Sequence, residues 1–465
     1  MTLACFKAYD VRGRLGVDLD AGIAFRIGRA FAKVLGARRV VLGRDCRASS
    51  EELATAVAAG LMAEGCTVLD LGLCGTEEVY FATDHLGADG GIEVTASHNP
   101  MDYNGMKMVR AGAAPVGWDT GLAEMARLAG RDDFGPVGQG QRERVDCRAD
   151  YVERVIGFVD RSALRPLHVL VNAGNGTAGP TFDAIAARLA AMGAALRFTR
   201  LHHAPDGAFP NGIPNPLLPE NQPVTAQAVL AAGADLGVAW DGDFDRCFLF
   251  DETGAFIPGE YIVGLLAEVF LAKEPGAAIV HDPRVVLATQ AAIVAAGGRA
   301  VQARTGHAFL KAALRETGAV YGGEMSAHHY FRDFMACDSG MIPWLLIVEL
   351  MGRTGQSLSA LMAARRAAHP SSGEINFRVD DVAAVLARIE AAHAPGAAID
   401  RMDGVSFRYA DWRFNVRASN TEPLLRLNVE SAGDAGLVAR QVAAISALIL
   451  GRDHDFSAKN PITGH

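Results

Sequence analysis

The sequence predicts several α/β domains followed by one smaller α+β domain, and three observations support that prediction. Strand-like apolar runs alternate with alanine-rich helical runs over the first three quarters of the 465-residue chain, a pattern typical of α/β domains with buried strands. A glycine followed by a short strand and a polar cluster occurs three times in this part. After about Pro370, apolar and polar residues alternate as they do in antiparallel strands.

We therefore expect three tandem α/β domains with mixed, largely parallel sheets around a central cleft, and a C-terminal α+β domain with an antiparallel sheet. Polar segments near residues 146–150 and 251–254 mark two of the boundaries. The expected domains are residues 1–147, 148–251, 252–369 and 370–465.

Apolar periodicity predicts the elements of the first domain. Ser49 and Ser50 are good helix-capping residues, and an apolar-periodic segment follows them. The expected helix covers residues 51–64, and the expected strands cover residues 39–43, 67–71 and 91–96. The last of these strands ends beside Ser97, so a reactive side chain there would be displayed at a strand end.

The second and third domains repeat this alternation, which starts again near Leu167 and Ala278. The glycine motif occupies residues 87–97, 233–241 and 318–326. Because ligands of α/β sheets bind at the carboxyl ends of strands, we expect each domain to contribute one loop to a shared cleft. Between two of the motifs, residues 204–223 are too rich in proline for a helix or a central strand, which predicts an ordered loop or a linker.

The fourth domain is predicted to combine antiparallel strands with one helix. Its strands are expected at residues 405–409, 411–417 and 424–430, and its helix at residues 436–450. This change of pattern separates the fourth domain from the first three.

The composition is that of an ordinary globular protein, with 50% hydrophobic and 21% charged residues. The longest apolar runs are too short to span a bilayer, and the N-terminus lacks the apolar core of a signal peptide. The seven cysteines are scattered without a Cys-x-x-Cys pair, which argues against a disulfide framework and a zinc site. A cytoplasmic protein without a membrane partner is expected.

The formal net charge of −9 is mild, and the chain has no basic run of the kind that follows a nucleic acid backbone. Nucleic acid is therefore not an expected partner. An anionic ligand would need a local cluster of positive side chains.

The segment Asp241-Gly-Asp-Phe-Asp-Arg246 is the strongest chemical signal in the sequence. Its three carboxylates at alternate positions can converge on one hard cation, and three acidic oxygens suit Mg²⁺. A calcium-binding EF-hand loop would also place acids at these offsets, but it needs glycine where Arg246 lies and helices where strand-like runs flank the segment. A solvated acidic turn is the other alternative, and the apolar flanks favour Mg²⁺ binding over it.

Ser97 opens three alternatives, because His98 follows it and Asn99-Pro100 comes next. A serine hydrolase is disfavoured, since Gly-x-Ser-x-Gly is absent and an adjacent histidine seldom acts as the base for its neighbour. A simple turn is typical of serine and asparagine before proline. The acidic loop elsewhere in the chain favours the third alternative, phosphoryl transfer, which needs a positioned carrier and neutralised charge.

Two further clusters are suggestive only in combination with the first two. Glu324, Ser326 and His328 could hydrogen-bond vicinal hydroxyl groups and supply an acid/base group, or they could be ordinary polar surface. The segment after Arg417 offers hydroxyls, an amide and turn N–H groups, so it could cradle a phosphate or be a plain hairpin loop.

Taken in order, these four clusters resemble those of the α-D-phosphohexomutase superfamily, the phosphoglucomutase/phosphomannomutase group. The resemblance runs from residues 6–13 (FKAYDVRG) to residues 417–423 (RASNTEP), and it includes Thr305-Gly-His307 and the loop of residues 209–221. The amino-acid sequences of residues 240–246 and 322–331 are most similar to those of bacterial phosphomannomutases that feed GDP-mannose synthesis.

The resemblance implies a role for each cluster. Ser97 would be carried as phosphoserine. Mg²⁺ would be held by this serine phosphate together with Asp241, Asp243 and Asp245. The residues that lower the charge at the moving phosphoryl group would be His98, Lys107 and Arg246. Residues that contact the sugar hydroxyls would be Glu324 and Ser326. The non-reacting phosphate would be gripped by Arg417, Ser419, Asn420 and Thr421. The residues lining the cleft would be Tyr9, Arg12, Arg284, His307 and His328, the last of them a candidate acid/base group.

The implied activity is the interconversion of mannose 6-phosphate and mannose 1-phosphate through a hexose 1,6-bisphosphate, which would also act as activator. The implied partners are small hexose phosphates, and no oligomeric state is predicted. The alternatives are a phosphoglucomutase or dual-specificity phosphohexomutase, a Mg²⁺-dependent sugar phosphatase, and a non-catalytic sugar-phosphate sensor. Three positions depart from the pattern of many relatives, namely Phe244, Arg284 and Arg304.

Overall fold

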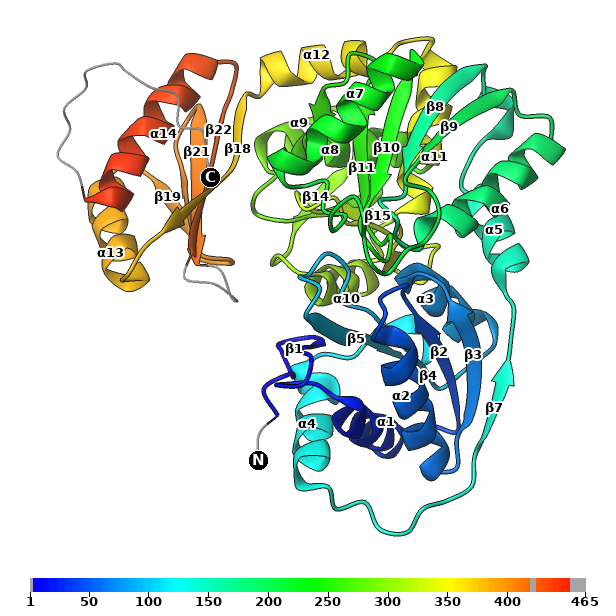
Figure 1. Cartoon of the computed structure of the whole chain (residues 1–465). Helices are drawn as coiled ribbons and strands as arrows, with labels where there is room; N and C mark the ends of the chain where they lie inside the picture. The colour runs from blue at the N-terminus through cyan, green and yellow to red at the C-terminus, as the bar shows by residue number, and fades with distance from the viewer. Residues whose placement is uncertain (1–2, 419–423, 452–465) are drawn as a thin grey trace.

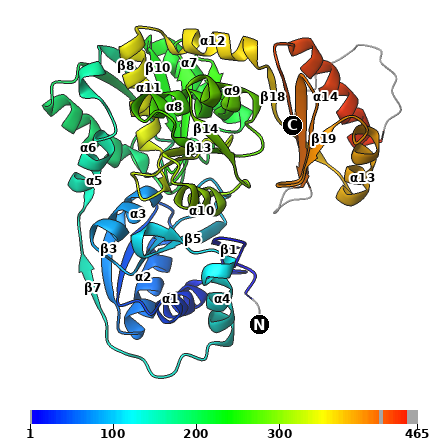
Figure 2. The same ribbon diagram turned by 180° about the vertical axis from the view of Figure 1, so that it is seen from behind.

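Four β-sheets organise the molecule, as the computed structural model shows for residues 3–418 and 424–451 (Figure 1). The units built on the first three sheets lie against one another. The fourth lies to one side of them and is reached through β18 (Ser371–Arg378), as the reverse view also shows (Figure 2). The predicted order of three α/β units and one antiparallel C-terminal unit is confirmed.

The first sheet has the strand order β1-β5-β4-β2-β3-β7, with β6 paired to β5. Strands β4, β2, β3 and β7 run parallel, whereas β5 is antiparallel to both β4 and β1. Its strands are β1 (Val11–Arg14), β2 (Arg39–Arg44), β3 (Thr67–Leu73), β4 (Gly90–Val94), β5 (Tyr103–Arg110), β6 (Ala114–Pro115) and β7 (Gln141–Arg144). Its helices are α1 (Ala21–Leu35), α2 (Ser50–Ala63), α3 (Thr76–His85) and α4 (Leu122–Arg131).

The second sheet has the order β12-β11-β10-β8-β9, and the third has the order β14-β13-β15-β16-β17. The strands of the second are β8 (Leu167–Asn172), β9 (Leu196–Leu201), β10 (Leu236–Trp240), β11 (Cys247–Asp251) and β12 (Phe256–Ile257). Those of the third are β13 (Ala278–His281), β14 (Arg299–Gln302), β15 (Tyr321–Gly323), β16 (His329–Phe331) and β17 (Cys337–Asp338). The helices of this region are α5 (Arg148–Ile156), α6 (Ala178–Ala191), α7 (Gln222–Ala232), α8 (Gly259–Lys273), α9 (Leu287–Ala295), α10 (His307–Thr317), α11 (Met341–Thr354) and α12 (Leu358–Ala368).

The three α/β units repeat one topology. Four neighbouring strands of each sheet follow the same order: β5-β4-β2-β3, β11-β10-β8-β9 and β16-β15-β13-β14. The second strand in each of these orders is β4, β10 or β15, and each comes after a glycine with positive φ. Each forms an antiparallel hairpin with the strand that follows it in the chain. These glycines are Gly87, Gly233 and Gly318, so the faint repeat in the sequence corresponds to a structural repeat.

The fourth sheet is antiparallel, with the order β18-β22-β21-β20-β19. Its remaining strands are β19 (Ala398–Asp400), β20 (Val405–Arg408), β21 (Trp412–Ala418) and β22 (Leu424–Ser431), and its helices are α13 (Val382–His393) and α14 (Ala435–Leu450). Both helices lie on the side of the sheet away from the other units (Figure 1). They enclose a hydrophobic cluster of their own around Phe414, Leu427 and Ile445.

A single hydrophobic cluster extends through the first three units and contains Tyr80, Trp240 and Tyr321. The first three units therefore share a core with one another but not with the fourth unit. Among residues 3–418 and 424–451, no helix combines the length and the apolar character that crossing a membrane requires.

The start of α2 and the proline-rich segment differ in detail from the predictions. Helix α2 begins behind Ser49, but the Ser49 side chain does not cap it, because its hydroxyl accepts a hydrogen bond from Asn104 Nδ2 at 2.8 Å instead. The proline-rich segment 204–223 is an ordered loop, as predicted, only as far as Leu218. Pro219–Asn221 form a helical turn, and the last two residues begin α7, where Pro223 is tolerated because N–H groups of the first turn have no partner within the helix. In the part of the chain that the structure describes, this loop packs against the first unit at Gly207, whose added Cβ would lie 2.1 Å from the carbonyl oxygen of Cys46.

Candidate active site

The loops that follow β4, β10 and β15 meet at one place, as the repeated motif predicts. Ser97 follows β4 and donates a hydrogen bond of 2.7 Å to Asp241 Oδ2 from the loop after β10. Arg246 forms an isolated β-bridge with His328 from the loop after β15. The first two loops touch through their backbones at Gly242, where an added Cβ would lie only 2.5 Å from the Ser97 carbonyl oxygen.

Ser97 is buried and has φ of 47°, a left-handed conformation that is uncommon for a residue with a side chain. Its backbone N–H donates to Thr95 Oγ1 at 2.8 Å, and its Oγ also lies 3.0 Å from His98 Nδ1. Burial, together with the nearby charges of Arg246 and Arg12, holds the pKa of His98 well below its usual range. The imidazole beside Ser97 is therefore neutral near pH 7.

The acidic loop fits a divalent cation. One carboxylate oxygen of Asp241, Asp243 and Asp245 lies within 4.8 Å of the corresponding oxygens of the other two. The Oδ1 atoms of all three are buried without a hydrogen-bond partner among the described residues. Burial and the two neighbouring aspartates raise the pKa of Asp241 to about 7. A cation bound between hard oxygen ligands would satisfy these atoms and relieve the repulsion.

Two basic side chains already offset part of this negative charge. Lys107 Nζ donates to Asp243 Oδ2 at 2.7 Å and also to Asp245. Arg246 Nε lies 3.4 Å from Asp241 Oδ2. Burial alone would lower the pKa of Lys107 and of Arg246, but the aspartates raise both pKa values, so both side chains are charged.

The loop after β15 supplies Glu324, Ser326 and His328. His328 Nδ1 lies 3.1 Å from Ser326 Oγ and 3.3 Å from Glu324 Oε2. Although burial and Arg246 oppose its charge, Asp245 and Glu324 raise the pKa of His328 to about 9. Arg246 Nε lies 3.2 Å from His328 Nε2, and only the neutral ring can accept this hydrogen bond. Arg246 therefore favours the neutral form of His328, whereas the two carboxylates favour the charged form.

Glu324 is ionised and held in one orientation. Burial raises its pKa, but this effect is outweighed by His328 and Arg284, which lower the pKa below its usual range. Glu324 Oε1 accepts from the Gly306 N–H at 2.7 Å, and Oε2 accepts from the Tyr330 hydroxyl at 2.7 Å.

Tyr9 and His307 join the first unit to the third, and Arg12 lies three residues after Tyr9 in the chain. Arg12 donates to Asn99 Oδ1 in the serine loop and to Asp10 Oδ2 at 3.0 Å. Tyr9 packs edge-on against His307, the first residue of α10, with 4.9 Å between ring centroids. Burial and the nearby Lys311 lower the pKa of His307 to about 3.

Arg284 and Arg417 form a second group, which lies between the third and fourth units. Arg284 is paired with Asp282, lies 3.8 Å from Glu324 and is 3.5 Å from Glu374. Arg417 Nη2 donates to the same Glu374 at 3.2 Å. Among the described residues no hydrogen bond joins Arg417 to the Ser97 cluster. The other three predicted phosphate ligands, Ser419, Asn420 and Thr421, lie outside the described residues.

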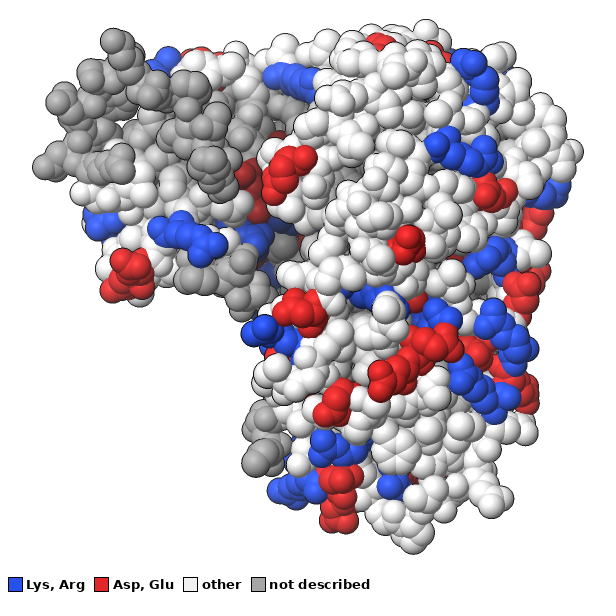
Figure 3. Space-filling model, in the orientation of Figure 1, with Lys and Arg blue, Asp and Glu red and all other residues white. Residues whose placement is uncertain are grey.

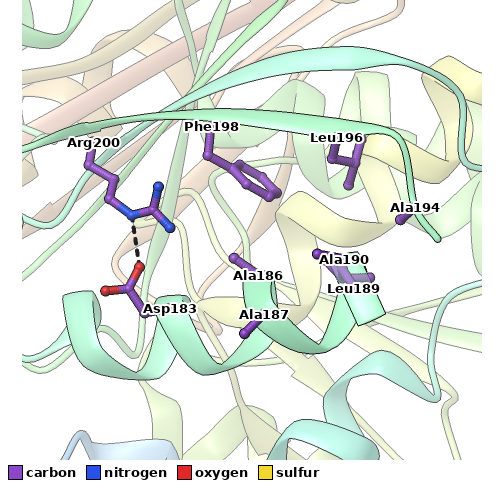
Figure 4. A pocket seen from close by; sticks show the side chains of 9 residues that line it. All are labelled: Asp183, Ala186, Ala187, Leu189, Ala190, Ala194, Leu196, Phe198 and Arg200. Carbon is purple, nitrogen blue, oxygen red and sulfur yellow. Dashed lines mark hydrogen bonds and ion pairs between the residues drawn. The ribbon is translucent and has the colours of Figure 1, made fainter. Parts of the chain in front are cut away.

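The predicted site residues and the hollow between α6 and β9 lie in different parts of the molecule. In the space-filling view the fourth unit overhangs a recess beside the first and third units (Figure 3). A different hollow of about 490 Å³ lies between α6 and β9 and is lined mostly by alanine, leucine and Phe198 (Figure 4). Its only charged lining residues are Arg200 and Asp183, which bind each other at 2.8 Å. It contains none of the predicted site residues.

Sequence reasoning missed two contributors to the cluster. Thr76 at the start of α3 donates from Oγ1 to Asp243 Oδ2 at 2.6 Å. Arg47, just after β2, donates to the serine loop. Both residues follow carboxyl ends of parallel strands in the first sheet, the same edge at which Ser97 lies, and this position is the signal that could have identified them.

Comparison with known proteins identifies the family of the chain. Four family models match in order: phosphoglucomutase/phosphomannomutase alpha/beta/alpha domain I over residues 4–127, domain II over 149–254, domain III over 258–368, and the C-terminal domain over 374–448. A phosphomannomutase of Salmonella typhimurium is 58% identical over 451 residues, which cover 96% of this chain and 99% of that protein. A phosphomannomutase of Escherichia coli K12 is 55% identical over 451 residues, with the same coverage of each chain.

A solved structure agrees over the whole length. A phosphoglucomutase/phosphomannomutase family protein from Burkholderia thailandensis superimposes with a TM-score of 0.85 at 34% identity and covers 97% of this chain and 99% of its own. Phosphohexose mutases of Xanthomonas campestris are 54% identical over 454 residues, covering 97% of this chain and 100% of that protein. The chain therefore belongs to the phosphoglucomutase/phosphomannomutase family of isomerases.

Proposed function

We propose that this protein is a phosphomannomutase, which interconverts mannose 6-phosphate and mannose 1-phosphate through phosphoserine 97 and a hexose 1,6-bisphosphate. The observation that carries the proposal is the placement of a buried Ser97 hydroxyl 2.7 Å from Asp241 Oδ2, within a cluster of three aspartates and basic side chains. The proposal is also supported by relatives named phosphomannomutase at 55–58% identity over 96% of the chain.

In the proposed reaction Ser97 carries the phosphoryl group that moves. The free hydroxyl of the sugar phosphate attacks the phosphorus, the bond between phosphorus and Ser97 Oγ breaks, and Ser97 Oγ takes up a proton. The hydroxyl proton leaves to a base, for which the candidate is His328 in its neutral form, the form that can accept the hydrogen bond from Arg246 Nε. The bisphosphate then turns around and returns its other phosphoryl group to Ser97. A hexose 1,6-bisphosphate would phosphorylate free Ser97 in the same way, which explains its proposed role as activator.

Asp241, Asp243 and Asp245 would hold Mg²⁺ together with the serine phosphate. Bound there, the cation would neutralise charge on the phosphoryl oxygens, which phosphoryl transfer requires. Lys107 and Arg246 add fixed positive charge beside these carboxylates, and neutral His98 lies next to Ser97 Oγ. Lys107 and Arg246 offset part of the charge of the three carboxylates, and a bound Mg²⁺ would give the cluster the positive charge that an anionic ligand needs.

The remaining residues would bind and orient the sugar phosphate. Glu324 and Ser326 would contact hydroxyl groups that look alike in both orientations of the bisphosphate. The distal phosphate would bind Arg417, Ser419, Asn420 and Thr421, and the residues Tyr9, Arg12, Arg284 and His307 would line the cleft. Closure of the fourth unit over the sugar would exclude water, which would otherwise hydrolyse the phosphoserine. The product would feed GDP-mannose synthesis.

A phosphoglucomutase or a dual-specificity enzyme is the second candidate. Mannose and glucose differ only in the orientation of the 2-hydroxyl, while Glu324 and Ser326 are proposed to contact other hydroxyls. The matching family models carry both enzyme names, and the Xanthomonas relatives are named phosphohexose mutases, which also favours this candidate.

The decisive assay supplies purified protein with Mg²⁺, a trace of hexose 1,6-bisphosphate and, in turn, mannose 1-phosphate, glucose 1-phosphate and glucosamine 1-phosphate. We expect rapid isomerisation of the mannose compound and little of the glucosamine compound. Much faster turnover of glucose 1-phosphate would make the second candidate correct. Release of inorganic phosphate without isomer exchange would identify a phosphatase, and binding without turnover would identify a sensor.

A further inference from the structure

Arg47 is a buried arginine that the proposed chemistry does not use. It follows β2, its side chain is only 3% exposed, and its guanidinium points at the backbone of the loop that carries Ser97. Nη2 donates to the carbonyl oxygen of Ser97 at 2.9 Å and to that of Asn99. Nη1 donates to the carbonyl oxygens of Pro100 at 3.0 Å and Tyr103 at 3.3 Å. One side chain thus binds four carbonyl groups of a single loop.

The loop needs such support because Ser97 has a left-handed backbone, with φ of 47°. For a residue with a side chain this conformation costs on the order of 1 kcal/mol or more, and it persists only where surrounding contacts hold it. Asp45 contributes from the same turn as Arg47, since its Oδ1 accepts from the Arg47 N–H at 2.9 Å. The Arg47 charge is itself balanced, because Nε lies 3.7 Å from Asp45 Oδ2.

The second unit covers the other side of Arg47. Phe209, from the proline-rich loop 204–223, lies with its ring centroid 5.5 Å from Arg47 Cζ, a distance typical of a cation–π contact. Phe209 is only 5% exposed. The same loop packs closely against the first unit at Gly207, two residues before Phe209.

We propose that Arg47 and Phe209 form a clamp that positions Ser97 for phosphoryl transfer, with Arg47 as the positioning residue and Phe209 as its cover. This inference rests on the proposed function of Ser97 as the phosphoryl carrier. Transfer needs the serine oxygen, the phosphorus and the incoming hydroxyl in line, and a displacement of about 1 Å can reduce the rate about a hundredfold. The clamp also gives the proline-rich loop a function, because Phe209 of this loop makes the second unit contribute to the positioning of Ser97.

Arg47→Lys is the informative change because it keeps the charge but removes the planar fork, so one ammonium cannot reach four carbonyl oxygens. The chain offers a matched control in Arg29, another buried arginine of the first unit. Arg29 Nη2 donates to the carbonyl of Gly135 at 3.2 Å, and its Cζ lies 4.7 Å from the Phe134 ring. That loop leads into the amino end of β7, at the opposite edge of the sheet from Ser97.

The first readout is hydrogen–deuterium exchange of residues 95–105, which does not depend on any activity. We expect Arg47→Lys to increase exchange in this segment about tenfold, because the carbonyl contacts that hold the loop are lost, while Arg29→Lys leaves it unchanged. Unchanged exchange in Arg47→Lys would overturn the clamp, whatever reaction the protein catalyses.

The second readout is steady-state kinetics with the sugar phosphate that wild-type protein turns over. Arg47→Lys should lower kcat about ten- to hundredfold with KM within about twofold, since Arg47 is proposed to position the phosphoryl carrier rather than to bind the sugar. Arg29→Lys should lower the melting temperature without changing kcat. Phe209→Leu, which keeps the site apolar but removes the ring, should lower kcat about threefold and decides the case if Arg47→Lys does not fold.

The two proposals fail in different ways. A wild-type protein that isomerises no hexose phosphate would overturn the proposed function, while exchange would still report on the clamp. A wild-type mutase whose Arg47→Lys and Phe209→Leu variants keep full kcat would overturn the positioning role alone.

Discussion

At the residue scale, Ser97 has the properties that a phosphoryl carrier needs. Its left-handed backbone turns it toward the second unit, and its hydroxyl reaches Asp241 across the boundary between two units. Its neighbour His98 is neutral, so it adds no charge that would pair permanently with a serine phosphate.

Removing this hydroxyl should abolish turnover. We expect Ser97→Ala to lower kcat by about a thousandfold or more, because no carrier remains for the phosphoryl group. Intact-mass measurement should show that a phosphate's mass is lost with it, while Ser162→Ala, an exposed serine distant from the cluster in sequence, keeps both the phosphate and the activity. Phosphate that persists on another residue of Ser97→Ala would refute the role of Ser97.

His329 illustrates a residue whose protonation opposes folding. It is fully buried in β16, its Nδ1 lies 2.7 Å from the Tyr321 hydroxyl, and burial lowers its pKa to about 3. Since an unfolded histidine has a pKa near 6.5, the unfolded state binds a proton below that pH while the folded state does not. His329 therefore does not reduce the free energy of unfolding above pH 6.5, but it reduces this free energy progressively as the pH falls from 6.5 toward 3.

This effect predicts a steeper loss of stability in acid than a variant without the imidazole would show. Between pH 6.5 and 5 the contribution of His329 amounts to about 2 kcal/mol. Urea unfolding at both pH values should show that His329→Gln loses less stability on acidification than the wild type, whatever its stability at pH 6.5. His85→Gln, at a half-exposed histidine, serves as the control. Equal acid sensitivity of wild type and His329→Gln would show that the buried imidazole is not responsible.

At the element scale, the acidic loop and the serine loop approach so closely that only glycine fits between them. At Gly242 an added Cβ would lie 2.5 Å from the Ser97 carbonyl oxygen, a backbone atom that cannot move without displacing the serine. Glycine at position 242 therefore lets the backbone of Ser97 lie close to the loop that carries the three aspartates.

Gly242→Ala should separate these two loops. We expect a stability loss of about 1–3 kcal/mol from overpacking and a fall in kcat of at least about tenfold, because the serine is displaced from the aspartates. Gly264→Ala is the matched control, since its added Cβ in α8 would meet nothing closer than 3.4 Å. Thermal unfolding and kinetics of both variants provide the measurement, and a fully active Gly242→Ala would mean that the loops tolerate a wider spacing.

At the scale of the whole molecule, the first three units share one hydrophobic cluster while the fourth has its own. The contacts between them are largely polar, such as Arg413 Nη2 donating to the Pro283 carbonyl at 2.8 Å and the Val286 N–H donating to Glu430 at 3.2 Å. Polar contacts of this kind would allow the fourth unit to move over the recess in which we propose that the sugar binds, without exposing a core.

Separate cores predict separate unfolding. In a urea titration followed by pulsed hydrogen exchange, peptides from residues 371–431 should unfold with a different midpoint from peptides of residues 236–251. Peptides of α3 and of β15, whose buried side chains belong to the cluster that joins the first three units, should share one midpoint. A single transition for all peptides would show that the interface couples the fourth unit to the rest.

The sequence by itself determined the order of the elements and indicated the residues that we propose carry the chemistry. Periodicity and glycine position are local properties, so the strand predicted at residues 39–43 is observed as β2 (Arg39–Arg44), and the threefold motif located Ser97, Asp241 and Glu324 at strand ends. A local cap was predicted less well, because Ser49 takes its partner, Asn104, from a distant strand.

Only the tertiary structure decided which atoms meet across the units. The 2.7 Å contact of Ser97 with Asp241, the place of Lys107 between two aspartates and the four carbonyl contacts of Arg47 join residues far apart in the chain. The physical reason is that such contacts depend on how the elements of a unit pack together and how the units pack against one another, and no local pattern records that packing. The left-handed backbone of Ser97 is the clearest case, since distant side chains hold a conformation that its own residue type disfavours.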